Sequence, residues 1–129
     1  MRRRMMKSKV HRATVTGAEP DYPGSISLDP RLMELADILP HEQVQVLDVD
    51  NGARLETYAI AGRPGEVCLN GAAARLVEPG HVVIVVTYAD YDEHELAGHF
   101  PLVVHVDGAN RPRGHAVGAP GEPGVAGVA

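Results

Sequence analysis

The sequence predicts a small, mainly β protein, a compact β-barrel with one clear helix and a disordered C-terminal tail. Short runs rich in Val, Ile and Thr recur between Gly, Pro and Asn turn signals, a pattern typical of small barrels. One segment has the apolar spacing of a helix. We expect a single domain over 1–113, because 114–129, rich in Gly, Pro and Ala, buries too little surface to become ordered.

The predicted strands are 10–16, 26–28, 43–49, 54–60, 67–69, 81–87 and 102–106. Between two of them, Asn51-Gly52 indicates a hairpin in which both turn positions need a positive φ. The segment 81–87 is apolar for too long to have one wet side, so it should be a central strand or one covered by another subunit. Because aromatic residues make up only 4% of the chain, the core must consist of Val, Leu, Ile and Ala.

The helix is predicted over about 30–38. Asp29 can cap its free N–H groups, Pro30 suits the first helical position, and Pro40 ends it. Its apolar face, at spacings of i, i+3, i+4 and i+7, consists of Leu32, Leu35, Ala36 and Leu39. We also expect a short helix in the acidic segment 90–96.

The loop that contains Tyr22-Pro23-Gly24-Ser25 has the most informative chemistry. Pro20 and Asp21 are turn formers, and Gly24, which lacks a Cβ, leaves its carbonyl open to attack. The Ser25 hydroxyl can attack that carbonyl and convert the amide to an ester. Elimination across Cα–Cβ of Ser25 then breaks the chain, and hydrolysis of the resulting dehydroalanine gives a pyruvoyl group. Most Gly-Ser pairs are only turns, so this hypothesis needs support from other residues.

Composition argues against several classes of protein. The formal net charge of −5, from 12 basic and 17 acidic residues, argues against a general nucleic-acid binder. The single cysteine, Cys68, cannot form an internal disulfide, fits a reducing compartment and is expected to be a small buried side chain. The basic start at 1–4 is not followed by the apolar stretch of a signal peptide, and no apolar run is long enough to cross a membrane. We therefore expect a soluble, cytoplasmic protein with no nucleic-acid or membrane partner.

Common catalytic motifs do not match. The seven histidines form no H-x-x-x-H or H-E-x-x-H pair and there is no C-x-x-C, so no metal site is predicted. Phosphate-binding glycine loops are missing as well. A hydrolase built from Ser25, His11 and Asp21 is disfavoured because the sequence lacks G-x-S-x-G.

Two cations and a phenol fall on predicted strands, at Lys9, Arg54 and Tyr58. Each alone would be an ordinary solvated side chain. Arg54 and Tyr58 have the same parity and so face the same side of their strand, whereas Thr57 has the opposite parity. Either the strand is bulged at this point, or Thr57 acts from the other side.

Several motifs in this order resemble the pyruvoyl-dependent aspartate 1-decarboxylase family. They are Lys9-Val10-His11-Arg12, Tyr22-Pro23-Gly24-Ser25, Asn51-Gly52-Ala53-Arg54, Thr57-Tyr58-Ala59-Ile60 and Asn70-Gly71-Ala72-Ala73-Ala74. The resemblance runs from about residue 5 to about residue 106. It implies a double-psi β-barrel, a homotetramer with sites between subunits, and self-cleavage between Gly24 and Ser25 into fragments 1–24 and 25–129.

The resemblance also implies a reaction, the decarboxylation of L-aspartate to β-alanine for pantothenate and coenzyme A. The cofactor would be the pyruvoyl group made from Ser25, which forms a Schiff base with the substrate amine, without a metal or pyridoxal phosphate. Tyr58 would be the proton donor, and Gly24, Ser25 and Thr57 would serve cleavage. Substrate-binding residues would be Lys9, Arg54, Thr57, Gly71, Ala72 and Ala73, and further pocket residues would be His11, Tyr22 and Asn70.

Two departures from the family pattern are visible, Pro23 and His81. Proline restricts both its own φ and Tyr22, so it could speed or slow cleavage. His81 follows Gly80 at a turn, where we expect little consequence. Other readings remain: a pyruvoyl enzyme for another amino acid, or an unprocessed small β-barrel that binds a partner. Whether cleavage is spontaneous or assisted by a maturation factor stays open.

Overall fold

The computed structural model of the chain describes residues 1–113 and 116–117, which form nine strands and three short helices. The strands are β1 (Arg3–Thr14), β2 (Gly17–Glu19), β3 (Ser25–Leu28), β4 (Gln43–Asp48), β5 (Arg54–Ala61), β6 (Val67–Asn70), β7 (Val82–Tyr91), β8 (Leu102–His105) and β9 (Ala116–Val117). The helices are α1 (Pro30–Leu35), the 3₁₀ helix η1 (Gly71–Arg75) and α2 (Glu93–Leu96). The predicted mainly β class is confirmed. Apart from β9, the predicted tail lies outside the described residues.

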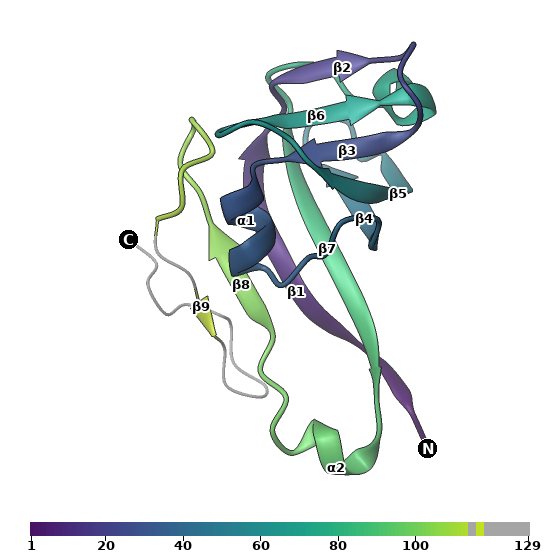
Figure 1. Ribbon diagram of the computed structural model, residues 1–129, viewed down its shortest axis with the longest axis vertical. Coiled ribbons are helices and arrows are strands. Elements are labelled where there is room, and N and C mark those ends of the chain that lie inside the picture. Colours follow the sequence, from purple (N-terminus) through teal and green to yellow (C-terminus); the bar gives the residue numbers. More distant parts are fainter. Residues whose placement is uncertain (114–115, 118–129) are drawn as a thin grey trace.

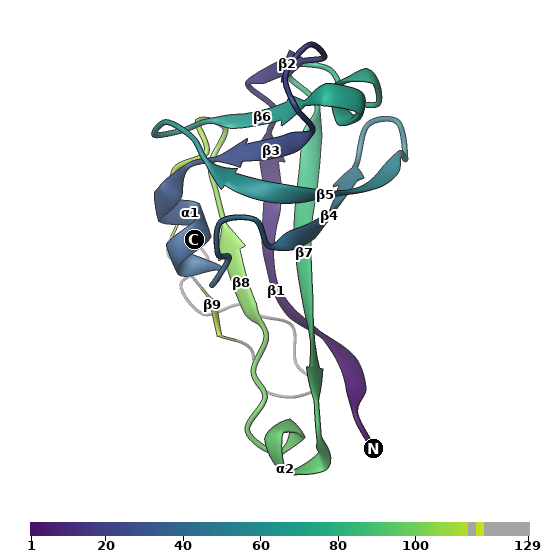
Figure 2. The same cartoon turned by 45° about the vertical axis from the view of Figure 1, so that its right-hand side comes forward.

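The strands join in the order β2-β6-β3-β5-β4-β7-β1-β8-β9. Figures 1 and 2 show β2, β6, β3 and β5 lying across one end of the long β1 and β7 strands, with α2 at the other end. This strongly curved arrangement is consistent with a small β-barrel. β7 lies between β4 and β1, which confirms the prediction that the apolar segment 81–87 is a central strand.

The core consists of aliphatic side chains, as the composition predicted. Its fully buried members include Val10, Ile26, Leu28, Leu32, Val46, Leu69 and Val85. They come from strands on both parts of the curved sheet and from α1, so one core supports both. No helix in the described part of the chain is long and apolar enough to cross a membrane.

The helix α1 is shorter than predicted. Asp29 caps it, accepting a hydrogen bond from Arg31 N at 2.8 Å, but it ends at Leu35. Asp37 has a φ of 53°, in the left-handed region, which is incompatible with a continuing α-helix. Consequently Leu39, predicted on the apolar face, is 66% exposed.

The predicted hairpin is present, but its turn differs from the expected two-residue type. Gly52 has a φ of 76°, whereas Asn51 is not among the residues with a positive φ. The connection is longer, because Asp48 N donates to Ala53 O at 2.8 Å and Gly52 N donates to Asp48 O at 2.9 Å. The Asp48 carboxylate shapes this turn by accepting hydrogen bonds from Asp50 N and Asn51 N.

Candidate functional site

The Gly24–Ser25 peptide bond lies where an exposed loop enters the core. Gly24 is exposed, whereas Ser25, the first residue of β3, is only 3% exposed. Ser25 is paired with Asn70 of the antiparallel strand β6. The Asn70 Nδ2 group donates to Ser25 Oγ at 2.8 Å and to Ser27 Oγ at 3.0 Å. A buried amide therefore holds the hydroxyl next to the Gly24–Ser25 peptide bond.

Gly71 packs directly against this bond. It has a φ of 66°, and a Cβ at this position would lie 2.7 Å from Gly24 Cα and 2.8 Å from Gly24 N. Such separations are well below van der Waals contact, so position 71 requires glycine for both reasons. The Gly71 backbone thus closely approaches the Gly24 backbone.

One cleft, of about 220 Å³, opens on the Ser25 side of the bond. Its lining residues are Tyr22, Pro23, Ser25, Ser27, Tyr58, Ile60 and Asn70. Tyr58 reaches it because β5 runs parallel to β3, with Ala59 opposite Ile26. The structure thus brings together four predicted site residues that are up to 48 positions apart in the sequence, from Tyr22 to Asn70. We call this the serine cleft.

A second cleft, of about 270 Å³, is lined by Gly24 but not by Ser25 and is called the glycine cleft below. Its lining residues are Gly24, Leu55, Glu56, Thr57, Asn70, Ala72, Ala73 and Leu76. The pairing of β5 with β4 continues without a register shift from Arg54 to Tyr58. The strand is therefore not bulged at Thr57, and Thr57 lies on the opposite side of β5 from Tyr58.

Besides Gly71, which packs against Gly24, three predicted residues are not among those that line either cleft of the single chain. Lys9 and His11 are on β1, where they pair with Val103 and His105 of β8. Arg54 is exposed at the start of β5. The regular register of β5 places Arg54 and Tyr58 on the same side of the strand, as their spacing in the sequence predicted. Only Tyr58 lines the serine cleft.

His11 has an unusual environment on β1. Its ring contacts that of His105, with centroids 5.4 Å apart, and its buried Nδ1 has no hydrogen-bond partner among the described residues. Burial, followed by the nearby charge of Lys9 and by His105, lowers the pKa of His11. A neutral imidazole with an unused polar atom is therefore favoured at this position.

Sequence reasoning missed three residues that border the site. His41 lies beside Tyr58, with ring centroids 6.0 Å apart. Ser27 shares the Asn70 amide with Ser25, and Cys68 Sγ lies 3.5 Å from Asn70 Oδ1. The alternation of Ser25 with Ser27, and of Cys68 with Asn70, was a usable signal for one shared face, but it required knowledge that β3 pairs with β6.

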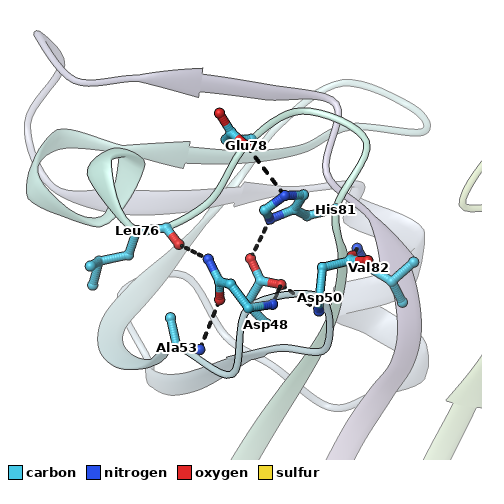
Figure 3. Close-up of polar contacts among 8 residues, drawn as sticks. Asp48, Asp50, Ala53, Leu76, Glu78, His81 and Val82 are labelled. Carbon is cyan, nitrogen blue, oxygen red and sulfur yellow. Dashed lines mark hydrogen bonds and ion pairs between the residues drawn. The ribbon is translucent and has the colours of Figure 1, made fainter.

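A separate polar cluster joins the β4–β5 hairpin to the start of β7 (Figure 3). The buried Asp48 carboxylate pairs with His81 Nδ1 at 2.7 Å, and Asp50 accepts a hydrogen bond from Val82 N at 2.7 Å. The hydrogen bond to Asp48, together with nearby carboxylates, raises the pKa of His81. His81, which lies at a turn, therefore forms an ion pair with Asp48.

The same cluster has the residue types of a metal site, with ligand atoms of Asp48, Asp50 and His81 within 4.8 Å of one another. Both Asp48 oxygens and Asp50 Oδ2 already accept hydrogen bonds within the protein. Metal binding would have to compete with these contacts. We therefore interpret Asp48, Asp50 and His81 as a polar cluster that fixes the β4–β5 hairpin to β7, and call it the hairpin clasp. The neighbouring Asn51 side chain donates a hydrogen bond to Leu76 O, at 2.9 Å, and Leu76 lines the glycine cleft.

A buried serine that lines one cleft directly follows a glycine that lines a second cleft, within a small mainly β fold. Comparison with known proteins identifies the class of protein. The model of the family described as "Aspartate decarboxylase" matches residues 1–113. The chain belongs to the aspartate decarboxylase family of enzymes.

Curated relatives cover most of the chain. The aspartate 1-decarboxylase of Syntrophobacter fumaroxidans is 57% identical over 114 residues, which are 87% of this chain and 92% of the relative. The aspartate 1-decarboxylase of Thermoanaerobacter pseudethanolicus is 54% identical over 114 residues, 87% of this chain and 97% of the relative. The enzyme of the same name from Moorella thermoacetica is 55% identical over 113 residues, 86% and 88% of the two chains.

Proposed function

We propose that this protein is a self-processing, pyruvoyl-dependent decarboxylase that converts L-aspartate to β-alanine and CO₂ in the cytoplasm, for pantothenate and coenzyme A synthesis. Membership of the family and the names of its relatives support the substrate. The observation that carries the processing step is the Ser25 hydroxyl, buried beside the Gly24 carbonyl and held by Asn70.

Cleavage begins when Ser25 Oγ attacks the Gly24 carbonyl carbon. The C–N bond breaks, the nitrogen takes the hydroxyl proton, and an ester links Gly24 to Ser25 Oγ. Removal of the Ser25 Cα proton then breaks the Cβ–Oγ bond, and Gly24 leaves as a carboxylate that keeps the electron pair. Water converts the remaining dehydroalanine to the pyruvoyl group and releases ammonia.

Residues of the two clefts are proposed to serve two different reactions, chain cleavage and substrate decarboxylation. Thr57 lines the glycine cleft and is proposed to steady the oxyanion that forms on the Gly24 carbonyl. Tyr58 lines the serine cleft beside residue 25 and is proposed to protonate the substrate carbon after CO₂ leaves. When formed, the pyruvoyl group supplies the electron sink for that departure.

Substrate binding requires cations, because aspartate carries two carboxylates. Arg54 offers a planar guanidinium suited to a bidentate grip, and Lys9 a second positive charge. Since Lys9 and Arg54 lie outside the serine cleft of a single chain, we propose that the functional unit is a homotetramer with sites completed between subunits. Backbone groups of Gly71, Ala72 and Ala73 would contact the substrate, and His11, Tyr22 and Asn70 would complete the pocket.

Intact mass and product release test the proposal together. The purified protein should show fragments 1–24 and 25–129, the larger one lighter by one ammonia than a simple hydrolysis product, and it should release CO₂ from aspartate in preference to glutamate. Ser25→Ala should stay uncut and inactive. A single uncut wild-type chain would instead favour the small binding module, and a cut chain that prefers another amino acid would change the substrate.

A further inference from the structure

Four buried polar side chains occupy one face of the β3–β6 pair next to the proposed cleavage bond. Ser25 is opposite Asn70, and Ser27 is opposite Cys68. Their exposed fractions are 3% for Ser25 and Asn70, 9% for Ser27 and 6% for Cys68. Because strand residues two apart share a face, the contacts among these side chains follow from the register of the two strands.

The Asn70 amide is held at both ends within this group. Its Nδ2 group donates to the hydroxyls of Ser25 and Ser27, and its Oδ1 atom faces Cys68 Sγ at 3.5 Å. The other carbonyl near the thiol, Leu69 O, is farther away at 4.0 Å. Rotation of the Asn70 amide by about 180° exchanges the positions of its oxygen and nitrogen. Hydroxyl partners are compatible with either orientation, because a hydroxyl can both donate and accept a hydrogen bond. The Cys68 thiol is therefore the partner that discriminates between the two orientations of the Asn70 amide.

The thiol is suited to act as a donor here. Burial, and then the negative charges of Glu66 and Glu19, raise the pKa of Cys68, so the sulfur keeps its proton at neutral pH. A protonated thiol donates to a carbonyl oxygen and is a poor acceptor for an N–H group. It favours the orientation in which Asn70 Oδ1 faces sulfur and Nδ2 faces the serines.

We propose that Cys68 is a positioning residue for chain cleavage, which orients the Asn70 amide so that its N–H group points at Ser25 Oγ. The inference rests on the proposed self-cleavage. In that reaction Oγ becomes the ester oxygen and then an oxygen of the departing Gly24 carboxylate, retaining the electron pair of the broken Cβ–Oγ bond. An N–H group aimed at this atom stabilises the charge as it develops. Cys68 itself touches no reacting atom and acts through Asn70.

Cleavage kinetics of matched variants test this role. Uncut precursor is prepared at low temperature, and the fraction cut is followed by intact mass. Cys68→Val keeps about the same volume but removes the donor, and it should slow cleavage about three- to tenfold, the range expected for one lost hydrogen bond. Cys68→Ser puts a hydroxyl at this position, which can donate to Asn70 Oδ1 but also accepts the turned amide, so it should cleave at a rate between those of the wild type and Cys68→Val. Leu69→Val, on the opposite face of β6, controls for altered packing.

A double-mutant cycle separates positioning from general destabilisation. If Cys68 acts through Asn70, Cys68→Val should cause no further slowing in the Asn70→Ala background. Cleavage of Cys68→Val at the wild-type rate, or equal slowing in both backgrounds, overturns the inference and leaves the proposed function intact. If the wild-type chain is never cleaved, both the inference about Cys68 and the proposed function are wrong. If Cys68→Val fails to fold, as judged by thermal unfolding, Cys68→Ala takes its place with the same criteria.

Discussion

Thr57 and Tyr58 are neighbours in β5, yet Thr57 lines the cleft that contains Gly24 and Tyr58 lines the cleft that contains Ser25. The alternation of a regular strand places consecutive side chains on opposite sides, and the uninterrupted register with β4 preserves that alternation. The two side chains therefore lie on opposite sides of β5. This relationship predicts that the two residues serve different steps.

Substitution of the two hydroxyl residues should give opposite phenotypes. Tyr58→Phe should cleave at the wild-type rate but lose turnover about 100-fold or more, as expected for removal of a proton donor. Thr57→Val should instead slow cleavage about 100-fold, because an oxyanion donor is lost. Intact mass measures cleavage, and CO₂ release from the cut fraction measures turnover. Normal turnover of Tyr58→Phe would remove Tyr58 from the mechanism.

Gly71→Ala should block or strongly slow cleavage, because its Cβ would displace the Gly24 backbone. Gly80→Ala is the matched control: Gly80 also has a positive φ, 91°, but a Cβ there meets nothing within 4 Å. Both variants should lose about 1–2 kcal/mol of stability from backbone strain. Only Gly71→Ala should also affect cutting, as followed by mass spectrometry. Similar cutting in the two variants would show that the contact with Gly24 is unimportant.

Mixed subunits test whether Lys9 and Tyr58 of one site come from different chains. Lys9→Ala and Tyr58→Phe should each be nearly inactive alone. When the two chains are co-expressed, some sites combine an intact Lys9 with an intact Tyr58, so activity should return. Native mass spectrometry should show four subunits in the active assembly. No recovery in verified mixed tetramers would place both residues in one chain's site.

The stability of the hairpin clasp should depend on pH through His81. Its hydrogen bond to Asp48, and then the charges of Asp48, Asp50 and Glu78, raise the pKa of His81 above the ordinary value of 6.5. The folded state therefore favours the protonated ring. The resulting stabilisation is complete below the ordinary pKa and is lost as the pH rises through the raised folded value.

Thermal unfolding between about pH 5.5 and 8.5 checks this expectation. The melting temperature of the wild type should fall relative to that of His81→Gln as the pH rises. The difference between the two proteins isolates His81 from His11, whose pKa is lowered and whose contribution has the opposite sign. Parallel curves for the two proteins would show that the ion pair with Asp48 contributes no pH-dependent stability.

Local sequence signals predicted local structure well. The Asp29-Pro30 start of α1 and the hairpin near Asn51-Gly52 are both present, because capping and turn formation depend on neighbouring residues. The end of α1 was misjudged because the left-handed backbone at Asp37 is not visible in apolar periodicity. The extent of the turn was misjudged because the buried Asp48 carboxylate organises it.

The sequence by itself determined the β class, the aliphatic core and the Gly24–Ser25 pair with its chemical potential, because composition, periodicity and a two-residue motif are properties of the chain. Only the tertiary structure decided that Asn70 holds Ser25, that Gly71 presses on Gly24, and that Thr57 and Tyr58 face different clefts. Those contacts depend on which strands pair and in what register. A shift of one residue would turn every side chain to the other face, and short-range patterns do not encode pairing between strands more than 40 residues apart.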